Sequence, residues 1–345
     1  MQSWKGKRND EGTEVSKRSK DDCGYGPKEK EPHLYLVLDD WSWGYSIRKI
    51  DLSFGIRKDL PVNDFGYPSL PSASFDPWTP KFKSNNMDGI LIYDVHMQSF
   101  IVGPPQIMDP VDPIYIPVGG RLFALAAGSF QLLYPPPEDE SDWDDFVWTW
   151  HTLPEPPFLH ELVTCYAVHS DQHTIFVSTG EHDPATFSFD TEMEGDGEWK
   201  RHGRWRMPFI GRVYFVPELD LWVGLGKHRR IFAVDVVSEE PDAVHVERYV
   251  DLPFKVCVDK PSCCHFTDQE PIGATLLSMG GGSTFCLLEY FGVNEMERIM
   301  RLMTFSLKYD KYGDLTMGKS IQTRYNRVPS EVSLSTLKTP VAFWM

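Results

Sequence analysis

The sequence predicts an all-β protein, and within that class a β-propeller of six blades rather than seven, with a disordered polar tail at its N-terminal side. Two features carry this prediction. Short runs rich in Val, Ile, Phe, Tyr and Trp, which favour strands, recur along the whole chain. The runs also repeat with a period of about 48 residues, and units of this length with four strands each are typical of propellers.

Prolines mark the ends of successive units. A strand followed by a proline-containing turn occurs five times, and the spacings between these prolines are 43, 50, 54 and 45 residues. The spacings are regular without being identical, as expected for repeats that carry loop insertions. The prolines are Pro61, Pro104, Pro154, Pro208 and Pro253, and they divide the chain into units 34–61, 62–105, 106–158, 159–209, 210–254 and 255–312.

A second repeated feature is a short apolar run that ends in an acidic residue. Each run is preceded by another β-rich segment, so every unit should hold three or four strands. The first unit is short, and we expect residues 328–345 to supply its missing strand, which would remove an exposed sheet edge. The runs are at 46–51, 90–94, 186–190 and 231–235, with looser copies at 130–134 and 285–289.

Two further expectations concern the rest of the architecture. A pair of β-sandwiches is the structural alternative, but it does not account for the regular spacing. The one segment that could form a helix is Val293–Met303, which could also be a loop leading into residues 301–310. Tryptophans at repeated or alternating positions are expected to pack between blades: Trp148, Trp150, Trp199 and Trp205.

Composition limits the compartment and the partner. The first 33 residues hold eight basic and seven acidic residues with few apolar ones, so we expect a disordered tail ahead of one domain at 34–345. Basic clusters at 5–8 and 17–20 resemble a bipartite nuclear signal, although a solvated tail is the alternative. Six scattered cysteines and the absence of an apolar leader favour an intracellular protein, cytoplasmic or nuclear. A net charge of −16 argues against nucleic-acid and anionic-membrane binding.

Several segments resemble a known family, namely His33–Trp41, Gly44–Ile47, Trp199–Phe209, Leu219–Gly224 and Thr304–Asp310. They are similar to a plant family, found mainly in grasses, that is known only as a domain of unknown function, number 1668. The resemblance runs from roughly residue 33 to the end of the chain. It implies a kelch-like propeller and brings no established activity and no catalytic residues.

Three motifs have the outline of chemical sites. Gly313–Ser320 matches the P-loop pattern, which needs a parallel strand before it and a helix after it. It follows an antiparallel meander and only 25 residues remain, so we expect a turn. Cys257 and the group Cys263–His265 lack the paired spacing of a zinc site and are expected to be structural thiols. His160–Glu161 lacks the second histidine of a zincin motif. No catalytic residue, metal or cofactor is predicted.

Loops that join second to third strands share one face of a propeller with the connections between blades. They surround the mouth of the channel, where loops on a rigid scaffold commonly carry function. Here they mix basic, acidic and aromatic side chains. The candidate binding residues are Trp41, Trp43, Glu181, His182, Asp183, Lys227, His228, Arg229 and Arg230, with the turn Gly280–Gly282.

Loops that join third to fourth strands are acidic instead. Three of them hold 13 acids and no Lys or Arg, and consecutive blades should place them side by side. They could form a docking surface for a basic partner or a solubilising rim. The acids are Glu138, Asp139, Glu140, Asp142, Asp144, Asp145, Glu192, Glu194, Asp196, Glu198, Glu239, Glu240 and Asp242.

These features favour a non-catalytic protein-recognition module, an interaction scaffold or adaptor. Its partner would be a protein, with a basic surface if the acidic loops dock it. The alternative is an enzyme or a metal-dependent specifier that acts at the channel mouth. Convergence of three or more His or carboxylate side chains at the mouth would favour that alternative.

Overall fold

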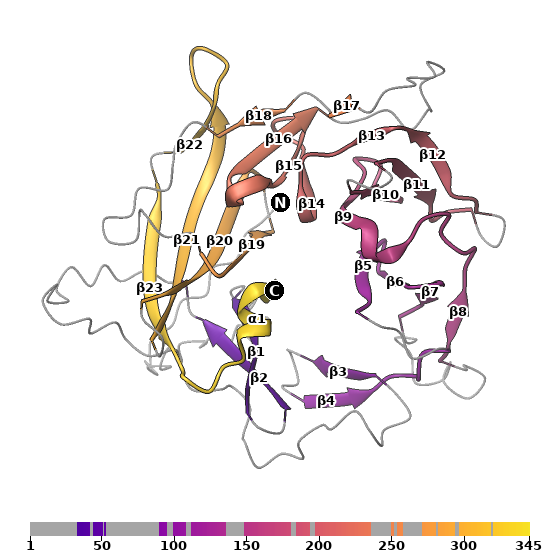
Figure 1. The fold of residues 1–345 in the computed structure, drawn as a ribbon, viewed down its shortest axis with the longest axis horizontal. Coiled ribbons are helices and arrows are strands. Elements are labelled where there is room, and N and C mark those ends of the chain that lie inside the picture. Colours follow the sequence, from indigo (N-terminus) through magenta and orange to yellow (C-terminus); the bar gives the residue numbers. More distant parts are fainter. Residues whose placement is uncertain are drawn as a thin grey trace, which may run out of the picture. The chain divides into compact units, whose positions relative to one another are not determined.

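The computed structural model describes residues 33–41, 44–50, 52, 90–94, 99–107, 112–135, 148–180, 184–193, 197–235, 250–251, 254–257, 271–280, 282–293, 297–318 and 320–345. They fall within one compact unit, His33–Met345. The predicted tail lies outside the described residues except for His33. The described part is all-β, as the sequence predicts, and consists of several antiparallel sheets (Figure 1).

The middle of the chain folds into three four-stranded antiparallel meanders (Figure 1). They correspond to the predicted units 106–158, 159–209 and 210–254, except that the last strand of the third meander lies just beyond residue 254. The second and third are joined edge to edge, because β9 pairs with β14 in parallel. The strands are β5 (Ile114–Val118), β6 (Arg121–Ala126), β7 (Ser129–Leu133) and β8 (Trp150–Thr152), then β9 (Val163–Val168), β10 (Thr174–Thr179), β11 (Thr186–Asp190) and β12 (Lys200–Gly203), then β14 (Ile210–Val216), β15 (Leu221–Leu225), β16 (Ile231–Asp235) and β18 (Lys255–Val256).

The next sheet is a meander of β19 (Gly273–Ser278), β20 (Thr284–Gly292) and β21 (Arg298–Tyr309). One half of β21 pairs with β22 (Leu315–Met317) and the other half with β23 (Gln322–Val328). The expectation of a helix or loop at 293–303 is therefore wrong for the part from Arg298 onward. Residues 299–305 are mostly apolar and are buried on both faces of a central strand, and periodicity alone does not separate such a strand from a buried helix.

The looser acid-ending run of this sheet, at 285–289, lies in β20, the second strand of the meander. The other acid-ending runs with a complete meander around them, at 186–190 and 231–235, form third strands, β11 and β16. The third strand here is β21, and it is followed by Asp310. Residues 304–310 are thus the equivalent segment.

The two ends of the domain pair with each other. The last strand, β24 (Val341–Trp344), pairs antiparallel with the first, β1 (Leu34–Trp41), and β2 (Gly44–Ile50) pairs with the other edge of β1. Beyond the strands, the backbones of His33 and Met345 exchange hydrogen bonds of 2.6 and 3.1 Å. The prediction that 328–345 completes the first sheet is confirmed.

Several shorter elements complete the described structure. Strands β3 (Leu91–Asp94) and β4 (Ser99–Val102) form a hairpin in the unit 62–105. Strands β13 (Trp205–Arg206) and β17 (Val250–Asp251) form a short parallel pair. Two 3₁₀ turns are η3 (His160–Leu162) and η4 (Lys227–Arg229), and the one α-helix of the described residues is α1 (Leu334–Lys338).

Hydrophobic cores lie between consecutive sheets. The sheet of β5–β8 shares a core with the next meander through Phe130 and Phe189. That meander shares a core with the third, where Phe176 and Trp222 are both fully buried and their rings lie 5.2 Å apart. Further cores join the third meander to β19–β21 and that sheet to β1 and β24. Apolar burial between sheets therefore holds the units in chain order.

A repeated hydrogen bond also joins successive units. The Trp150 indole N–H donates to the carbonyl of Pro104 at 3.2 Å, and the Trp199 indole N–H donates to Pro154, also at 3.2 Å. The acceptors are two of the prolines that mark unit ends. Trp148, Trp150, Trp199 and Trp205 all lie in or against the cores between sheets, which confirms their expected packing role.

The segment before β24 is positioned by close backbone contact. Leu337 of α1 is fully buried, and a Cβ at Gly273 of β19 would lie only 1.6 Å from the Leu337 carbonyl oxygen. The Ser333 N–H donates to the Asp39 carbonyl at 2.7 Å. The helix thus lies directly on β19 and sets the path into β24.

Gly273→Ala should loosen this contact, because the added methyl group displaces α1 and with it the approach to β24. We expect the free energy of unfolding, measured by urea denaturation, to fall by about 1–3 kcal/mol. Gly292→Ala is the matched control, since its Cβ would meet Ile272 Cδ1 at an ordinary 3.7 Å. Equal stability of the two variants would contradict the close docking of α1.

Candidate functional site

A pocket of about 190 Å³ lies beside the first strands of the three central meanders. Its walls come from Pro117–Gly119 at the end of β5, Tyr166 and Val168 of β9, Gln172 in the turn after β9, and Arg212–Phe215 of β14. Arg212 is the one charged residue among these lining residues. A single positive charge is thus placed among aromatic and apolar side chains.

Two tyrosines flank Arg212. Its guanidinium carbon lies 5.0 Å from the centroid of the Tyr214 ring, a cation–π distance. The parallel pairing of β14 with β9 places Arg212 opposite Tyr166. Burial raises the pKa of Tyr166 and of Tyr214, and the charge of Arg212 opposes both shifts. Both phenols are therefore neutral near pH 7 and keep a hydroxyl hydrogen to donate.

Arg212 is exposed, and it forms no ion pair with a carboxylate among the residues that the structure describes. Most buried or half-buried arginines of a fold satisfy their fork of N–H donors with an acceptor. Here the guanidinium lies over the ring of Tyr214 instead. The arrangement leaves a cation that can meet a ligand in the pocket.

The turn that carries Gln172 is held by Asp171. The Asp171 carboxylate accepts hydrogen bonds from the Thr174 hydroxyl at 2.6 Å and from the backbone N–H groups of His173 and Thr174 at 2.8 and 2.9 Å. The His169 Nδ1 lies 3.0 Å from the same carboxylate. Burial alone would raise the pKa of Asp171, but these hydrogen bonds hold it well below its usual range. The residue is an ionised anchor that fixes the turn.

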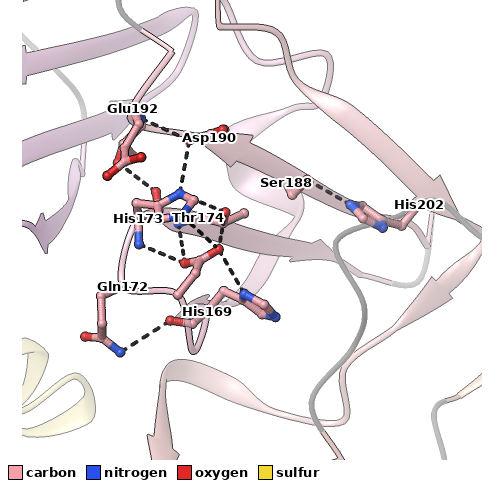
Figure 2. A network of polar contacts seen from close by, with 10 residues as sticks. His169, Gln172, His173, Thr174, Ser188, Asp190, Glu192 and His202 are labelled. Atoms are coloured by element: carbon pink, nitrogen blue, oxygen red, sulfur yellow. Dashed lines mark hydrogen bonds and ion pairs between the residues drawn. The ribbon is translucent and has the colours of Figure 1, made fainter.

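His173 connects this turn to the end of β11 (Figure 2). Its Nδ1 lies 3.1 Å from Asp190 Oδ1, and its Nε2 lies 3.6 Å from Asp171 Oδ2. Burial tends to lower the pKa of His173, but the charge of Asp171, the contact with Asp190 and the charge of Glu192 raise it above its ordinary value. Protonation of His173 therefore strengthens the fixation of the turn.

A neighbouring sheet is attached to the same network. Arg121, which follows the Gly119–Gly120 turn, donates to the Thr191 carbonyl at 3.0 Å and to the Thr191 hydroxyl at 3.2 Å. The Thr191 hydroxyl in turn donates to the His173 carbonyl at 2.7 Å. Two turns that border the pocket, from different sheets, are thereby joined by a continuous chain of hydrogen bonds.

Comparison with known families places the chain. A family model described as "Protein of unknown function (DUF1668)" matches residues 31–325, which is most of the sequence. The chain belongs to this family. The resemblance of residues 33–41 and of the other quoted segments to that family is confirmed.

Comparisons of this DUF1668 member with curated proteins and with solved structures do not indicate its activity. No curated protein matches it. Among solved structures, one similar chain is a Bacteroides fragilis protein described only provisionally as a 6-phosphogluconolactonase. It has a TM-score of 0.40 and 10% sequence identity, over 92% of this chain and 99% of that one. At this TM-score the likeness carries no argument about activity.

The expected channel-mouth residues are only partly described. Trp41 ends β1 without a described side chain, and Trp43 and Glu181–Asp183 lie outside the described residues. Lys227–Arg229 form the 3₁₀ turn η4, which is followed by Arg230 and connects β15 to β16, a second-to-third-strand connection as predicted. Arg229 donates to the Ile272 carbonyl at 3.0 Å, so this side chain supports the fold, whereas Lys227, His228 and Arg230 are exposed.

Gly280–Gly282 does not belong to that set. This turn joins β19 to β20, the first and second strands of their sheet. The expectation that these glycines join a second strand to a third, or one blade to the next, is therefore wrong. Among the predicted acids, Glu192 and Glu198 are described and exposed, and the other eleven lie outside the described residues.

The remaining motifs do not form chemical sites in the described part. Leu315–Met317 inside the P-loop-like pattern forms β22, antiparallel to β21, and Lys319 lies outside the described residues. Cys257 is buried, while Cys263, Cys264 and His265 are outside the description. His160–Glu161 begins the short turn η3. Within the described ranges no group of three His, Cys, Asp or Glu could hold a metal, and no helix is long and apolar enough to cross a membrane.

The pocket residues Tyr166, Gln172, Arg212 and Tyr214 are not predicted from the sequence. None belongs to a known motif. One signal was available, because Tyr166 and Tyr214 are 48 residues apart, which is the predicted repeat length. Equivalent positions on the first strands of consecutive sheets lie near each other, so this spacing could have indicated a shared site.

The raised pKa of His173 predicts a stability that depends on pH. In the unfolded chain the pKa is about 6.5, so the stabilisation is fully present below about pH 6.5 and is lost as the pH rises through the folded pKa. His173→Gln should lower the free energy of unfolding by no more than about 1 kcal/mol below that pH, and by less above it. Urea denaturation over a pH series measures this.

His151→Gln is the control, because His151 is an exposed histidine of β8 outside the network. For His151→Gln, the change in the free energy of unfolding should not show the larger destabilisation at acid pH that is expected for His173→Gln. A destabilisation by His173→Gln that is constant from acid to alkaline pH would contradict the protonated link.

Proposed function

We propose that this DUF1668 protein is a kelch-like propeller of six blades that serves as a non-catalytic protein-recognition module, an interaction scaffold or adaptor. Three observations support the propeller. Meanders follow one another in chain order, cores lie between consecutive sheets, and β24 completes the sheet of β1. These are the features expected when blades are arranged radially and the chain ends close the ring.

The observation that carries the recognition function is the size and composition of the pocket. Pockets that enclose whole small-molecule ligands usually measure about 300–1,000 Å³. The volume here is about 190 Å³, which suits one side chain of a larger partner. Its lining includes Tyr166, Tyr214 and Arg212, and Tyr and Arg are enriched among residues that dominate binding energy at protein interfaces.

The borders of the pocket support the same function. The turns at Gly119 and Gln172 are fixed by Arg121, Thr191 and Asp171, so the pocket exists before a partner arrives. A preformed site avoids the entropy cost of ordering loops on binding. We propose an intracellular protein partner, met in the cytoplasm or, given the basic clusters of the tail, in the nucleus. An enzyme or a metal-dependent specifier remains the alternative proposal.

Filling the pocket should abolish recognition. Pro117 is exposed and lines the pocket, so Pro117→Trp places a bulky ring in it. We expect affinity purification with quantitative mass spectrometry to show at least about a tenfold loss of the partners that the unaltered chain enriches. Tyr115→Trp is the control, because Tyr115 is an exposed residue of the same strand outside the pocket lining.

Partners captured equally by both variants would place recognition elsewhere. Stoichiometric iron, copper or zinc in the purified protein would instead favour the alternative of a metal-dependent specifier. Thermal unfolding of both variants checks that neither substitution disrupts β5.

The acidic loops make a separate prediction about the partner. If they dock a basic surface, neutralising the six acids of 138–145 should weaken capture, and the loss should be larger at low salt because screening is weaker. Binding measured over a salt series tests this. A control with the same change in net charge neutralises six acids of the tail instead: Asp10, Glu11, Glu14, Asp21, Asp22 and Glu29. Equal effects of the two variants would indicate a solubilising rim.

A further inference from the structure

We propose that the pocket binds a carboxylate presented by the protein partner, and that Arg212 is the residue that pairs with it. The inference rests on the proposed recognition function and adds the chemistry of the anchor. The partner would carry an Asp or Glu side chain, or a chain terminus, that enters between β5, β9 and β14.

The charge of the pocket selects the ligand. Arg212 is the one charged residue of the lining, and it is exposed without a carboxylate partner in the described part of the chain. A Lys or Arg anchor would meet a like charge at close range. A planar guanidinium matches a carboxylate in shape, because its parallel N–H groups can donate to both oxygens.

The number of charges favours a carboxylate over a phosphate. One guanidinium balances one negative charge, whereas phosphate groups are usually bound by clusters of arginines or by helix N-termini. The pocket lining offers one cation, and the chain as a whole carries a net charge of −16. A strongly anionic ligand would therefore be repelled by the molecule before it reached the site.

The surroundings of Arg212 strengthen the pairing. Tyr166 is a neutral phenol beside Arg212 and can donate a hydroxyl hydrogen to an anion, whereas the Tyr214 hydroxyl meets the Ser278 backbone and the Tyr214 ring lies against the guanidinium. Stacking on Tyr214 also restricts the guanidinium, which lowers the entropy lost when a ligand binds. The apolar side chains of Val213 and Val168 line the same pocket, so an ion pair formed inside it is less screened by water than one on an open surface.

This anchor is compatible with a basic partner surface. The acidic loops at 138–145, 192–198 and 239–242 would attract a positively charged region, and the pocket would take up one acidic residue near it. Such a combination of an attractive charged surface and one oppositely charged anchor discriminates among partners, because few surfaces offer both.

Selection from a random peptide library displayed against the full 345-residue chain tests the proposal. We expect the selected peptides to share an Asp or Glu at one position. In calorimetric titrations of a selected peptide with both ends capped, replacing that residue by Asn or Gln should weaken binding about 10- to 100-fold. If only peptides with a free C-terminus bind, the carboxylate is the chain terminus.

Variants of the protein test whether Arg212 is the residue that pairs with the carboxylate. Arg212→Gln should weaken binding of the acidic peptide by about the same 10- to 100-fold factor. It should leave the affinity of the Asn- or Gln-containing peptide nearly unchanged. Arg212→Lys should be intermediate, because it keeps the charge but loses the planar fork. Arg204→Gln is the control, since Arg204 is exposed on the protein surface outside the pocket lining and its replacement changes the net charge equally.

The outcomes separate this inference from the proposed function. Some peptides could bind the unaltered chain but not Pro117→Trp, and yet need no acidic residue. That result would support recognition by the pocket and overturn the carboxylate anchor. Acidic peptides that bind Arg212→Gln as tightly as the unaltered chain would overturn the role of Arg212. Selection of no peptide at all would count against both.

Discussion

The pairing of β24 with β1 is the constraint on which the rest of the domain depends. Four backbone partners, from Leu34 with Trp344 to Val37 with Val341, join segments about 300 residues apart in a sequence of 345. Their hydrogen bonds satisfy the edge of β1 that would otherwise be exposed. The contact is possible because α1 lies directly on Gly273 of β19 and directs the last residues toward β1. The first sheet and the fourth meander are thereby held against a common core.

Packing between sheets and the parallel pairing of β9 with β14 together give the candidate site its character. The four largest cores are each shared by two consecutive sheets, so a side chain on a first strand is placed by its neighbours in both units. Trp150 and Trp199 repeat the same hydrogen bond to the proline carbonyl of the preceding unit, which fixes the distance between units. The pocket is a consequence, because β5, β9 and β14 approach each other and leave a small space lined by Tyr166 and Arg212.

The polar network beside the pocket contributes rigidity at a modest energetic gain. Asp171 is an acceptor for two backbone N–H groups, one hydroxyl and one imidazole, which is why it stays ionised despite partial burial. Through Thr191 and Arg121 the network reaches the preceding sheet. None of these groups lines the pocket, although the neighbouring Gln172 does. Their role is therefore to position the turns rather than to touch a ligand. Recognition by Arg212 and two tyrosines would then need little reorganisation.

The sequence by itself determined the strand class, the order of the units and the pairing of the chain ends, since these follow from local propensity and from a repeat that prolines make visible. It misjudged residues 298–303, where a segment buried on both faces has no strand periodicity, and it expected Gly280–Gly282 to follow a second strand, whereas this turn follows the first strand of its sheet. It did not find the pocket. Tyr166 and Arg212 are far apart in sequence and become neighbours only because β9 and β14 pair in parallel across two units. Such contacts depend on how whole sheets pack on each other, and that is decided by tertiary structure.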